Sequence, residues 1–191
     1  MLHTFAFPFS EDAVEIVDHN CRTFLVSPKK TAQKNSLRFR VIGLLMKDAQ
    51  NRALFGLDEK GFLTLPVSSH LTAGFAEECF AEGLLQRFLG IPHTTKARFL
   101  YSQSLSSPLC LFSLYGFSLK DKSLLQKKRE DSNFLLLERH SFNALLALEP
   151  KKPTLLKLLV EEKIIERFYA SSVDKDETVA FSLEHGPGCA P

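Results

Sequence analysis

The chain has 191 residues, a net charge of +2 and a hydrophobic fraction of 45%. A chain of this length and composition is expected to form one folded domain with a sizeable core, and global disorder is excluded. Acidic and basic residues are intermingled, so the sequence lacks the basic face that nucleic-acid binding needs, and we expect no nucleic-acid partner.

The cysteines and the apolar runs indicate the compartment. The four cysteines show no CxxC spacing, so the sequence predicts neither a zinc site nor a disulfide framework. Cys79 and Cys110 lie in apolar patterns and are expected to be buried thiols. The N-terminal stretch lacks the basic and apolar regions of a secretion signal, and no apolar run approaches the ~20 residues of a membrane span. We therefore expect a cytoplasmic protein with no membrane partner.

The first third of the sequence predicts strands. Residues 15–28 are expected to form a short hairpin around a polar "DHN" turn. Residues 29–36 are polar and are expected to form a connector. Within residues 37–67, the turn sequences "KDAQN" and "DEKG" separate an apolar strand, a second strand and a short third strand that ends at Pro66.

From Thr72 the hydrophobic period changes from that of a strand to that of a helix. Gly90, which is followed by Ile91 and Pro92, is expected to end this helix. The apolar residues that recur at helical spacing are Phe75, Cys79, Ala81, Leu84, Leu85, Phe88 and Leu89.

The middle of the second half predicts three more strands. Residues 97–119 are apolar with a break and are expected to form two of them. Residues 120–131 carry many charges of both signs and are expected to form a solvated hairpin loop. Residues 134–140 are expected to form another short strand.

The chain is expected to end in two helices and a tail. Ser141 is expected to cap the first helix, and Pro153 to open the second over residues 154–170, which has a broad apolar face. The polar tail 171–191 is expected to fray toward its end. This order of strands and helices predicts a single α+β domain over residues 1–170, with a mixed sheet.

The same order of elements, with a Gly-containing loop leading into a helix that ends in "LGI", resembles the Nudix hydrolase superfamily. The box that characterises this family can be written G-x5-E-x7-R-E-U-x-E-E-x-G-U, with U an aliphatic residue. Laid on residues 69–91 without a gap, the closing "x-G-U" falls on Leu89-Gly90-Ile91, the inner aliphatic on Leu85 and the inner "GE" on Gly74-Phe75.

The resemblance extends to the branch of the superfamily that is similar to isopentenyl-diphosphate isomerase. That branch opens with a hairpin and continues through strands into a "G-H-x-x-x-G-E" entry to the box. The matching segments here are "EIVDHN" (15–20), "LRFRVIGLLMKDAQNRALF" (37–55), "SSHLTAGF" (68–75) and the stretch 134–159. The resemblance implies a Nudix-type α/β/α sandwich with a central mixed β-sheet flanked by helices.

In the family, glutamates of the box hold the divalent metals that neutralise a diphosphate and generate the attacking hydroxide. Hard cations of this kind require oxygen ligands, which leucine and phenylalanine cannot supply. The sequence therefore resembles a box that keeps its shape and has lost its metal site. Where the family has its own residues, this chain has Gly83 for Arg, Ser69 for the first Gly, and Phe75, Leu84, Arg87 and Phe88 for Glu.

Five residues of this region are candidates for ligand binding. Arg40, His70 and Arg87 could face an anion, and Arg87 stands where the resemblance puts the metal. Each has a structural alternative: Arg87 could pair in solvent with a helix glutamate, Arg40 could anchor a loop carboxylate, and His70 could be structural or merely exposed. Phe75 and Phe88 could line an apolar pocket, although core packing is the commoner role of Phe on a helix face.

Three functional hypotheses follow. In the first, the protein is catalytically inactive toward diphosphates, needs no cofactor and serves as a ligand-binding or protein-interaction module, with a small phosphorylated compound as its ligand. In the alternative, it is an active Nudix-type hydrolase of a nucleoside diphosphate or similar compound, with Mg²⁺ or Mn²⁺ held by Glu77, Glu78 or Glu138. The first two of these glutamates are, however, expected on the solvated face of their helix. In the third, the apolar face of helix 154–170 forms a homodimer.

Overall fold

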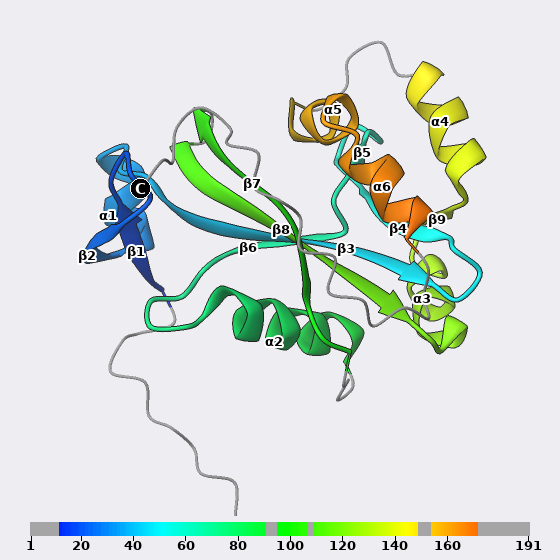
Figure 1. Ribbon diagram of the computed structural model, residues 1–191, viewed down its shortest axis with the longest axis horizontal. Coiled ribbons are helices and arrows are strands. Elements are labelled where there is room, and N and C mark those ends of the chain that lie inside the picture. The colour runs from blue at the N-terminus through cyan, green and yellow to red at the C-terminus, as the bar shows by residue number, and fades with distance from the viewer. Residues whose placement is uncertain (1–11, 91–94, 107–108, 149–153, 172–191) are drawn as a thin grey trace, which may run out of the picture.

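The fold is a mixed β-sheet with helices on both faces (Figure 1). The computed structural model describes residues 12–90, 95–106, 109–148 and 154–171. Helix α2 (Glu77–Leu89) lies on one face of the sheet, and helices α5 (Thr154–Glu161) and α6 (Ile164–Ala170) lie on the other. The expected α+β class is thereby confirmed.

Two long strands, β3 (Phe39–Asp48) and β8 (Leu109–Leu119), form the centre of the sheet. They pair in parallel from Phe39↔Cys110 to Asp48↔Leu119, and both are nearly continuous runs of buried residues, as strands covered on both faces should be. The other strands are β1 (Ala13–Val17), β2 (Thr23–Pro28), β4 (Ala53–Leu57), β5 (Leu63–Thr64), β6 (Val67–His70), β7 (Arg98–Ser106) and β9 (Phe134–Leu137). Strand β3 also pairs antiparallel with β4 and β6.

Most of the expected strands are confirmed. The hairpin expected over residues 15–28 consists of β1 and β2, and the strands expected within 37–67, 97–119 and 134–140 are all present. Strand β6 was not expected, because its sequence "VSSH" carries no strand pattern; pairing with the buried strand β3 imposes the extended conformation.

Two segments that were expected to be loops contain helices. The connector expected over 29–36 contains α1 (Lys29–Lys34), whose single apolar residue, Ala32, is fully buried beneath the N-terminal hairpin. The loop expected over 120–131 contains α3 (Lys122–Arg129). The Asp121 side chain caps α3 by accepting from the backbone N–H of Ser123 at 2.8 Å, and the buried Leu125 anchors it to the core. Each of these helices buries a single side chain, so its sequence shows no apolar periodicity from which a helix could be predicted.

The C-terminal helices differ from expectation at two points. Helix α4 (Arg139–Leu148) begins before Ser141, so Ser141 lies within its first turn and is not its cap. The single helix expected over 154–170 is two helices, α5 and α6, because the backbone at Lys163 is left-handed, with φ 57°. Pro153 and the tail beyond Ser171 lie outside the described residues.

Helix α2 ends where the sequence predicts. Gly90 adopts φ 73°, which suits glycine, and its N–H donates to the carbonyl of Gln86 at 2.9 Å. The helix begins at Glu77 rather than near Thr72, because the chain first turns through Gly74, which has φ 85°. Ile91 and Pro92 lie outside the described residues.

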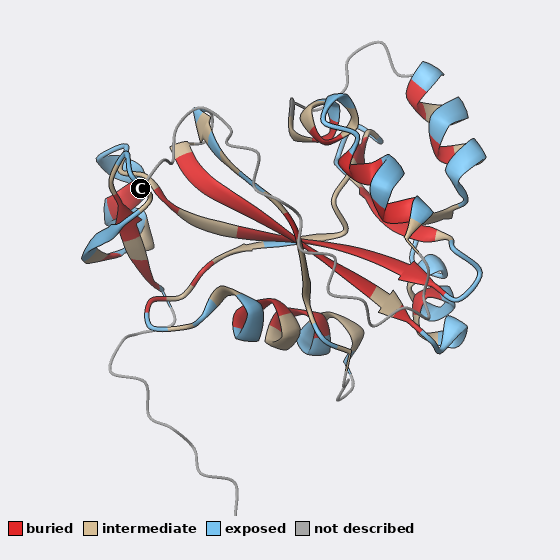
Figure 2. Cartoon of the chain, in the orientation of Figure 1, coloured by how far each residue is buried: buried red, intermediate tan, exposed pale blue. Residues whose placement is uncertain are grey.

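The core forms one layer on each face of the sheet (Figure 2). One layer packs α4, α5 and α6 against the sheet and includes Leu45, Phe142 and Phe168. The other packs α2 and α3 against the opposite face and includes Leu44 and Leu85. Side chains that alternate along β3 therefore divide between the two layers, as the pleat of a strand requires.

A buried lysine fixes the C-terminal end of α6. The Lys47 side chain is 0% exposed, and its Nζ donates to the carbonyl of Phe168 at 2.7 Å and to Asn51 Oδ1 at 3.0 Å. It also donates to the carbonyl and the hydroxyl of Ser171. Asn51 in turn donates from Nδ2 to the carbonyl of Tyr169 at 2.9 Å. These bonds satisfy carbonyls that a helix leaves unpaired at its C-terminal end.

The two free cysteines among the described residues differ in exposure. Cys110 is buried, as expected, and burial raises its pKa to about 11. Cys79 is exposed, which corrects the expectation of a buried thiol. Among the described residues, no helix is both long enough and apolar enough to span a bilayer.

Two glycines, one buried in the sheet and one in α2, should respond differently to alanine. A Cβ at Gly43 in β3 would lie 2.6 Å from Phe112 and 2.8 Å from Leu65, so we expect Gly43→Ala to lower the free energy of unfolding by about 1–3 kcal/mol. A Cβ at Gly83 in α2 meets nothing within 4 Å, so Gly83→Ala should raise it by roughly 0.5–1 kcal/mol. Denaturant unfolding of both variants measures the contrast, and equal effects would contradict the packing described.

Candidate functional site

The face of α2 that the family resemblance assigns to metal binding is packed against the sheet. Leu84 is 9% exposed and belongs to the same apolar cluster as the neighbouring Leu85. Phe88 contacts the ring of Phe134 in β9 edge-on, with ring centroids 5.4 Å apart. Phe75 packs on Phe80 in the same way, at 5.9 Å. Three of the positions where the family has glutamates therefore carry side chains of the core.

The fourth such position, Arg87, is exposed. Its guanidinium lies over the ring of Phe80, 5.8 Å from the centroid, which is a cation–π contact. Glu82, a glutamate of the same helix, accepts from the backbone N–H of Ala97 at 3.1 Å and so joins α2 to the approach to β7. On the same side, the ammonium of Lys128 lies 4.5 Å from the centroid of Phe88.

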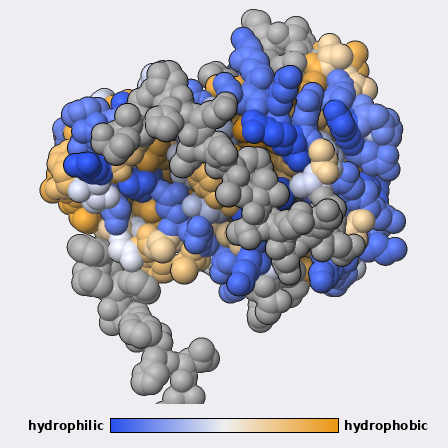
Figure 3. All heavy atoms as spheres, viewed as in Figure 1, coloured by the Kyte–Doolittle hydropathy of each residue, from blue (hydrophilic) through white to orange (hydrophobic). Residues whose placement is uncertain are grey.

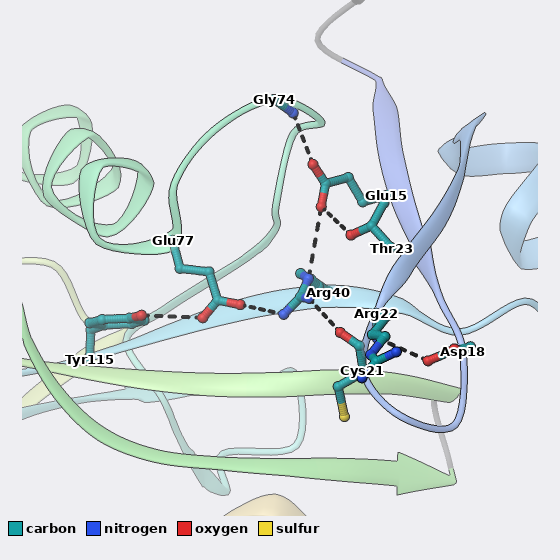
Figure 4. A network of polar contacts seen from close by, with 9 residues as sticks. All are labelled: Glu15, Asp18, Cys21, Arg22, Thr23, Arg40, Gly74, Glu77 and Tyr115. Carbon is teal, nitrogen blue, oxygen red and sulfur yellow. Dashed lines mark hydrogen bonds and ion pairs between the residues drawn. The ribbon is translucent and has the colours of Figure 1, made fainter. Parts of the chain in front are cut away.

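A polar network surrounds the N-terminal end of α2 (Figure 4). Arg40 of β3 is at its centre, with Nη1 donating to Glu77 Oε1 at 2.8 Å and Nη2 donating to the carbonyl of Cys21 at 2.7 Å. Its Nε lies 3.9 Å from Glu15 Oε2, so the guanidinium bridges two carboxylates. The hydroxyl of Tyr115 donates to the other oxygen of Glu77 at 3.2 Å.

Glu15 extends this network to the loop that precedes α2. Its carboxylate accepts from the backbone N–H of Gly74 at 3.2 Å and from the hydroxyl of Thr23 at 2.7 Å. Burial, followed by the negative charge of Glu77, raises the pKa of Tyr115 well above its usual range, so this hydroxyl remains a donor. The network therefore joins β1, β3, β8 and the entry to α2 through a single arginine.

The structure shows the partners of two of the predicted residues. Arg40 anchors carboxylates, as the structural alternative held, although the sequence did not identify its partner in α2. Glu77 was expected on the solvated face and is instead a half-buried member of the network. The helical period does not predict this contact. Glu77 is the first residue of α2, and from there its side chain can reach Arg40 of β3.

The other predicted residues are spread around the fold. His70 is half-buried on β6 and pairs with Val41 of β3. Arg87 follows Glu77 by ten positions in α2, which places it about 15 Å further along the helix axis than the Arg40 network. Glu78 is exposed, and Glu138 is an exposed residue next to α4 whose Oε2 lies 3.2 Å from His140 Nδ1. In the described part of the chain, no three His, Cys, Asp or Glu side chains group as a metal site requires.

The ion pair at the centre of the network should be measurably coupled. Arg40 and Glu77 are each about four-fifths buried, so a double-mutant cycle with Arg40→Ala and Glu77→Ala should give a coupling free energy of about 1–2 kcal/mol. The exposed pair Lys157–Glu161, at 3.7 Å, is a matched control and should couple by less than about 0.5 kcal/mol. Equal coupling free energies in the two cycles would contradict the expectation that burial strengthens the Arg40–Glu77 pair.

Comparisons with known proteins identify the fold. No protein-family model matches the sequence, and no curated protein is significantly similar to it. Among solved structures, DR0079 from Deinococcus radiodurans matches with a TM-score of 0.56 and 16% identity, over 82% of this chain and 99% of that one. Tm1382, assigned as a Nudix hydrolase, matches with a TM-score of 0.50 and 15% identity, over 82% of this chain and 91% of that one. The chain therefore has a Nudix-type fold.

Proposed function

We propose that this protein is a Nudix-fold binding module that does not hydrolyse diphosphates and serves to bind a ligand or a partner protein. The observation that carries the proposal is the packing of Leu84, Phe88 and Phe75. These side chains stand where the resemblance puts metal-binding glutamates, and they stabilise the interface between α2 and the sheet. A helix that contributes to the core in this way has no oxygen ligands to offer there.

The Arg40 network supports the same proposal. Its two carboxylates, from Glu15 and Glu77, are already bridged by a guanidinium. A divalent cation at this place would have to displace Arg40, which also donates to the carbonyl of Cys21. Because the arginine charge is permanent at physiological pH, the residues around the entry to α2 do not fit a metal ion.

A homodimer through the C-terminal helices has less support than the sequence suggested. The apolar residues of α5 and α6 that suggested it, including Leu156, Ile165 and Phe168, are buried against the sheet of the same chain. The surface over the C-terminal helices, at the upper right of Figure 3, is hydrophilic for the most part, with an apolar patch near its upper edge. Leu148 of α4 is 77% exposed, whereas the exposed pair Lys157 and Glu161 makes α5 polar on its outer side.

A hydrolysis assay tests the proposal. The protein is incubated with ADP-ribose and with isopentenyl diphosphate in the presence of Mg²⁺ or Mn²⁺, and the products are separated by chromatography. We expect no turnover above that of a buffer control. Metal-dependent turnover that is lost in the Glu77→Gln variant would overturn the proposal, because it would show a metal ligand outside the box positions.

A further inference from the structure

Three cations lie close to α6, on the face of the sheet opposite to α2. They are Lys47 from β3, Arg98 from β7 and Arg167 from α6. Arg98 donates from Nη2 to the hydroxyl of Ser171 at 2.9 Å, and Arg167 donates from Nη2 to the carbonyl of Glu162 at 2.6 Å. Every hydrogen-bond acceptor of these cations within the described chain is neutral, and none of the three forms a salt bridge with a described carboxylate.

The α6 helix accounts for only part of this charge. Lys47 satisfies carbonyls at the C-terminal end of α6, where a cation is also favoured by the helix dipole. Arg167 satisfies carbonyls at the end of α5. Arg98, by contrast, has only the Ser171 hydroxyl as a hydrogen-bond acceptor among the described residues, although its guanidinium has five N–H donors. Arg98 is half-buried, and burial lowers its pKa. Its positive charge also contributes to lowering the pKa of Lys47, so the two cations repel each other.

The two arginines line a common notch. It is lined by these two arginines and by the apolar residues Leu100, Ile164 and Phe168. The cavity volume is about 10 Å³, which is room for one oxygen-sized group. An apolar lining lowers the local dielectric and so strengthens the attraction between a guanidinium and an anion.

We propose that Arg98 and Arg167 form a binding site for a phosphate group, with one phosphate oxygen in the notch and the others at the surface. Guanidinium groups bind tetrahedral oxyanions through paired N–H donors. A doubly charged phosphate suits this place better than a singly charged carboxylate, because two arginines line the notch. Arg167 also lines an open hollow of about 280 Å³, together with Glu162, Glu166, Arg139 and Lys163, so these acids lie on the side of Arg167 away from the residues that line the notch alone.

This site is independent of the proposed function. The α2 packing and the notch lie on opposite faces of the sheet and share no residue. The loss of either proposal leaves the other standing, since phosphate binding requires neither a metal ion nor hydrolysis. The phosphate could belong to a free ion or to a phosphorylated metabolite, and both would present the same group to the notch.

Titration with inorganic phosphate tests the site. Calorimetry and thermal unfolding are recorded at neutral pH with sodium phosphate, against sodium chloride at equal ionic strength. We expect saturable binding that is weakened at least tenfold in Arg98→Gln and in Arg167→Gln. Arg129→Gln, which removes an exposed arginine of α3, is the matched control and should bind as the unaltered protein does.

Two variants and several anions are compared so that a folding defect is not mistaken for a loss of binding. The anions also distinguish a free phosphate ion from a phosphorylated metabolite. Arg167 is exposed, so Arg167→Gln should fold even if the half-buried Arg98 does not tolerate substitution. Sulfate should compete with phosphate, and acetate at equal ionic strength should not. A phosphomonoester that binds tenfold or more tightly than inorganic phosphate would identify a metabolite as the source, and equal affinity would identify the free ion. Absence of saturable binding, an undiminished response in Arg167→Gln, or an equal response to acetate would overturn the proposal.

Discussion

Replacement of Lys47 with alanine is expected to lower the free energy of unfolding by about 3 kcal/mol or more. The variant leaves the carbonyls of Phe168 and Ser171 buried without their donor, and it opens a cavity beneath the Phe168 ring, whose centroid lies 5.2 Å from Lys47 Nζ. The loss should be concentrated at α6, so hydrogen exchange of the amides from Ile164 to Ala170 should accelerate most. Denaturant unfolding combined with exchange measures both effects.

The matched variant for this prediction is Lys47→Met. Methionine fills most of the same volume without a donor, so it separates the cavity from the missing hydrogen bonds. We expect Lys47→Met to be destabilised by about 1–3 kcal/mol, less than Lys47→Ala. If neither variant changes the stability or the exchange of α6, Lys47 does not hold the helix as described.

The same lysine should give the stability a pH dependence. Burial, followed by the charge of Arg98, lowers the pKa of Lys47 from 10.5 to about 8. Between these values the unfolded chain retains a proton that the folded chain has released, so the free energy of unfolding should rise with pH. The expected gain between about pH 8 and pH 10 is roughly 1–2 kcal/mol, and Lys47→Met should lack it.

At higher pH the trend should reverse. Burial raises the pKa of Tyr115 and Tyr169 above the ordinary value of 10.0, so the unfolded chain loses these protons first. The stability that depends on the protonated hydroxyls is therefore lost as the pH rises above about 10. A stability profile that is flat from pH 8 to pH 10 in the unaltered protein would contradict the assignment to Lys47.

The second large effect concerns the box positions. Replacement of Leu84 with glutamate is expected to lower the free energy of unfolding by about 3 kcal/mol, because it places a carboxylate among apolar side chains. Arg87→Glu introduces a glutamate at an exposed position of the same helix and should change the stability by less than about 1 kcal/mol. The contrast therefore depends on burial and not on the charge introduced.

A metal titration of these variants shows whether the surroundings of α2 could still hold a metal ion once a glutamate is introduced. If α2 serves only as a packing element, neither Leu84→Glu nor Arg87→Glu should be stabilised by Mn²⁺. A rise in thermal stability with Mn²⁺ in either variant, and not in the unaltered protein, would mean that the surrounding geometry still suits a metal ion.

The elements that the sequence predicted well are those with strong local signals. The apolar runs of β3 and β8, the hairpin over residues 15–28 and the stop at Gly90 are set by patterns within a few residues. The expectation that Phe75 and Phe88 pack in the core also rested on such a pattern. Helix α3 was missed because its single buried leucine is surrounded by charges.

The parts that the sequence did not predict depend on contacts between distant residues. Lys47 is separated from its acceptor Ser171 by 124 positions, and Arg40 from Glu77 by 37. Nothing local distinguishes Lys47 from an exposed turn lysine, since only the fold places α6 above it. The break at Lys163 is similar, because the left-handed residue lets both halves of the C-terminal region keep their apolar faces on the sheet.

Isothermal titration of the unaltered protein with Mn²⁺, alone and with ADP-ribose present, tests the central claim most directly. It measures whether the protein binds a divalent metal ion although α2 packs apolar side chains against the sheet. We expect only heats of dilution, because Leu84 and Phe88 supply no ligands and Glu77 is held by Arg40. Micromolar binding of Mn²⁺ that disappears in Glu77→Gln would contradict this account and favour an active hydrolase.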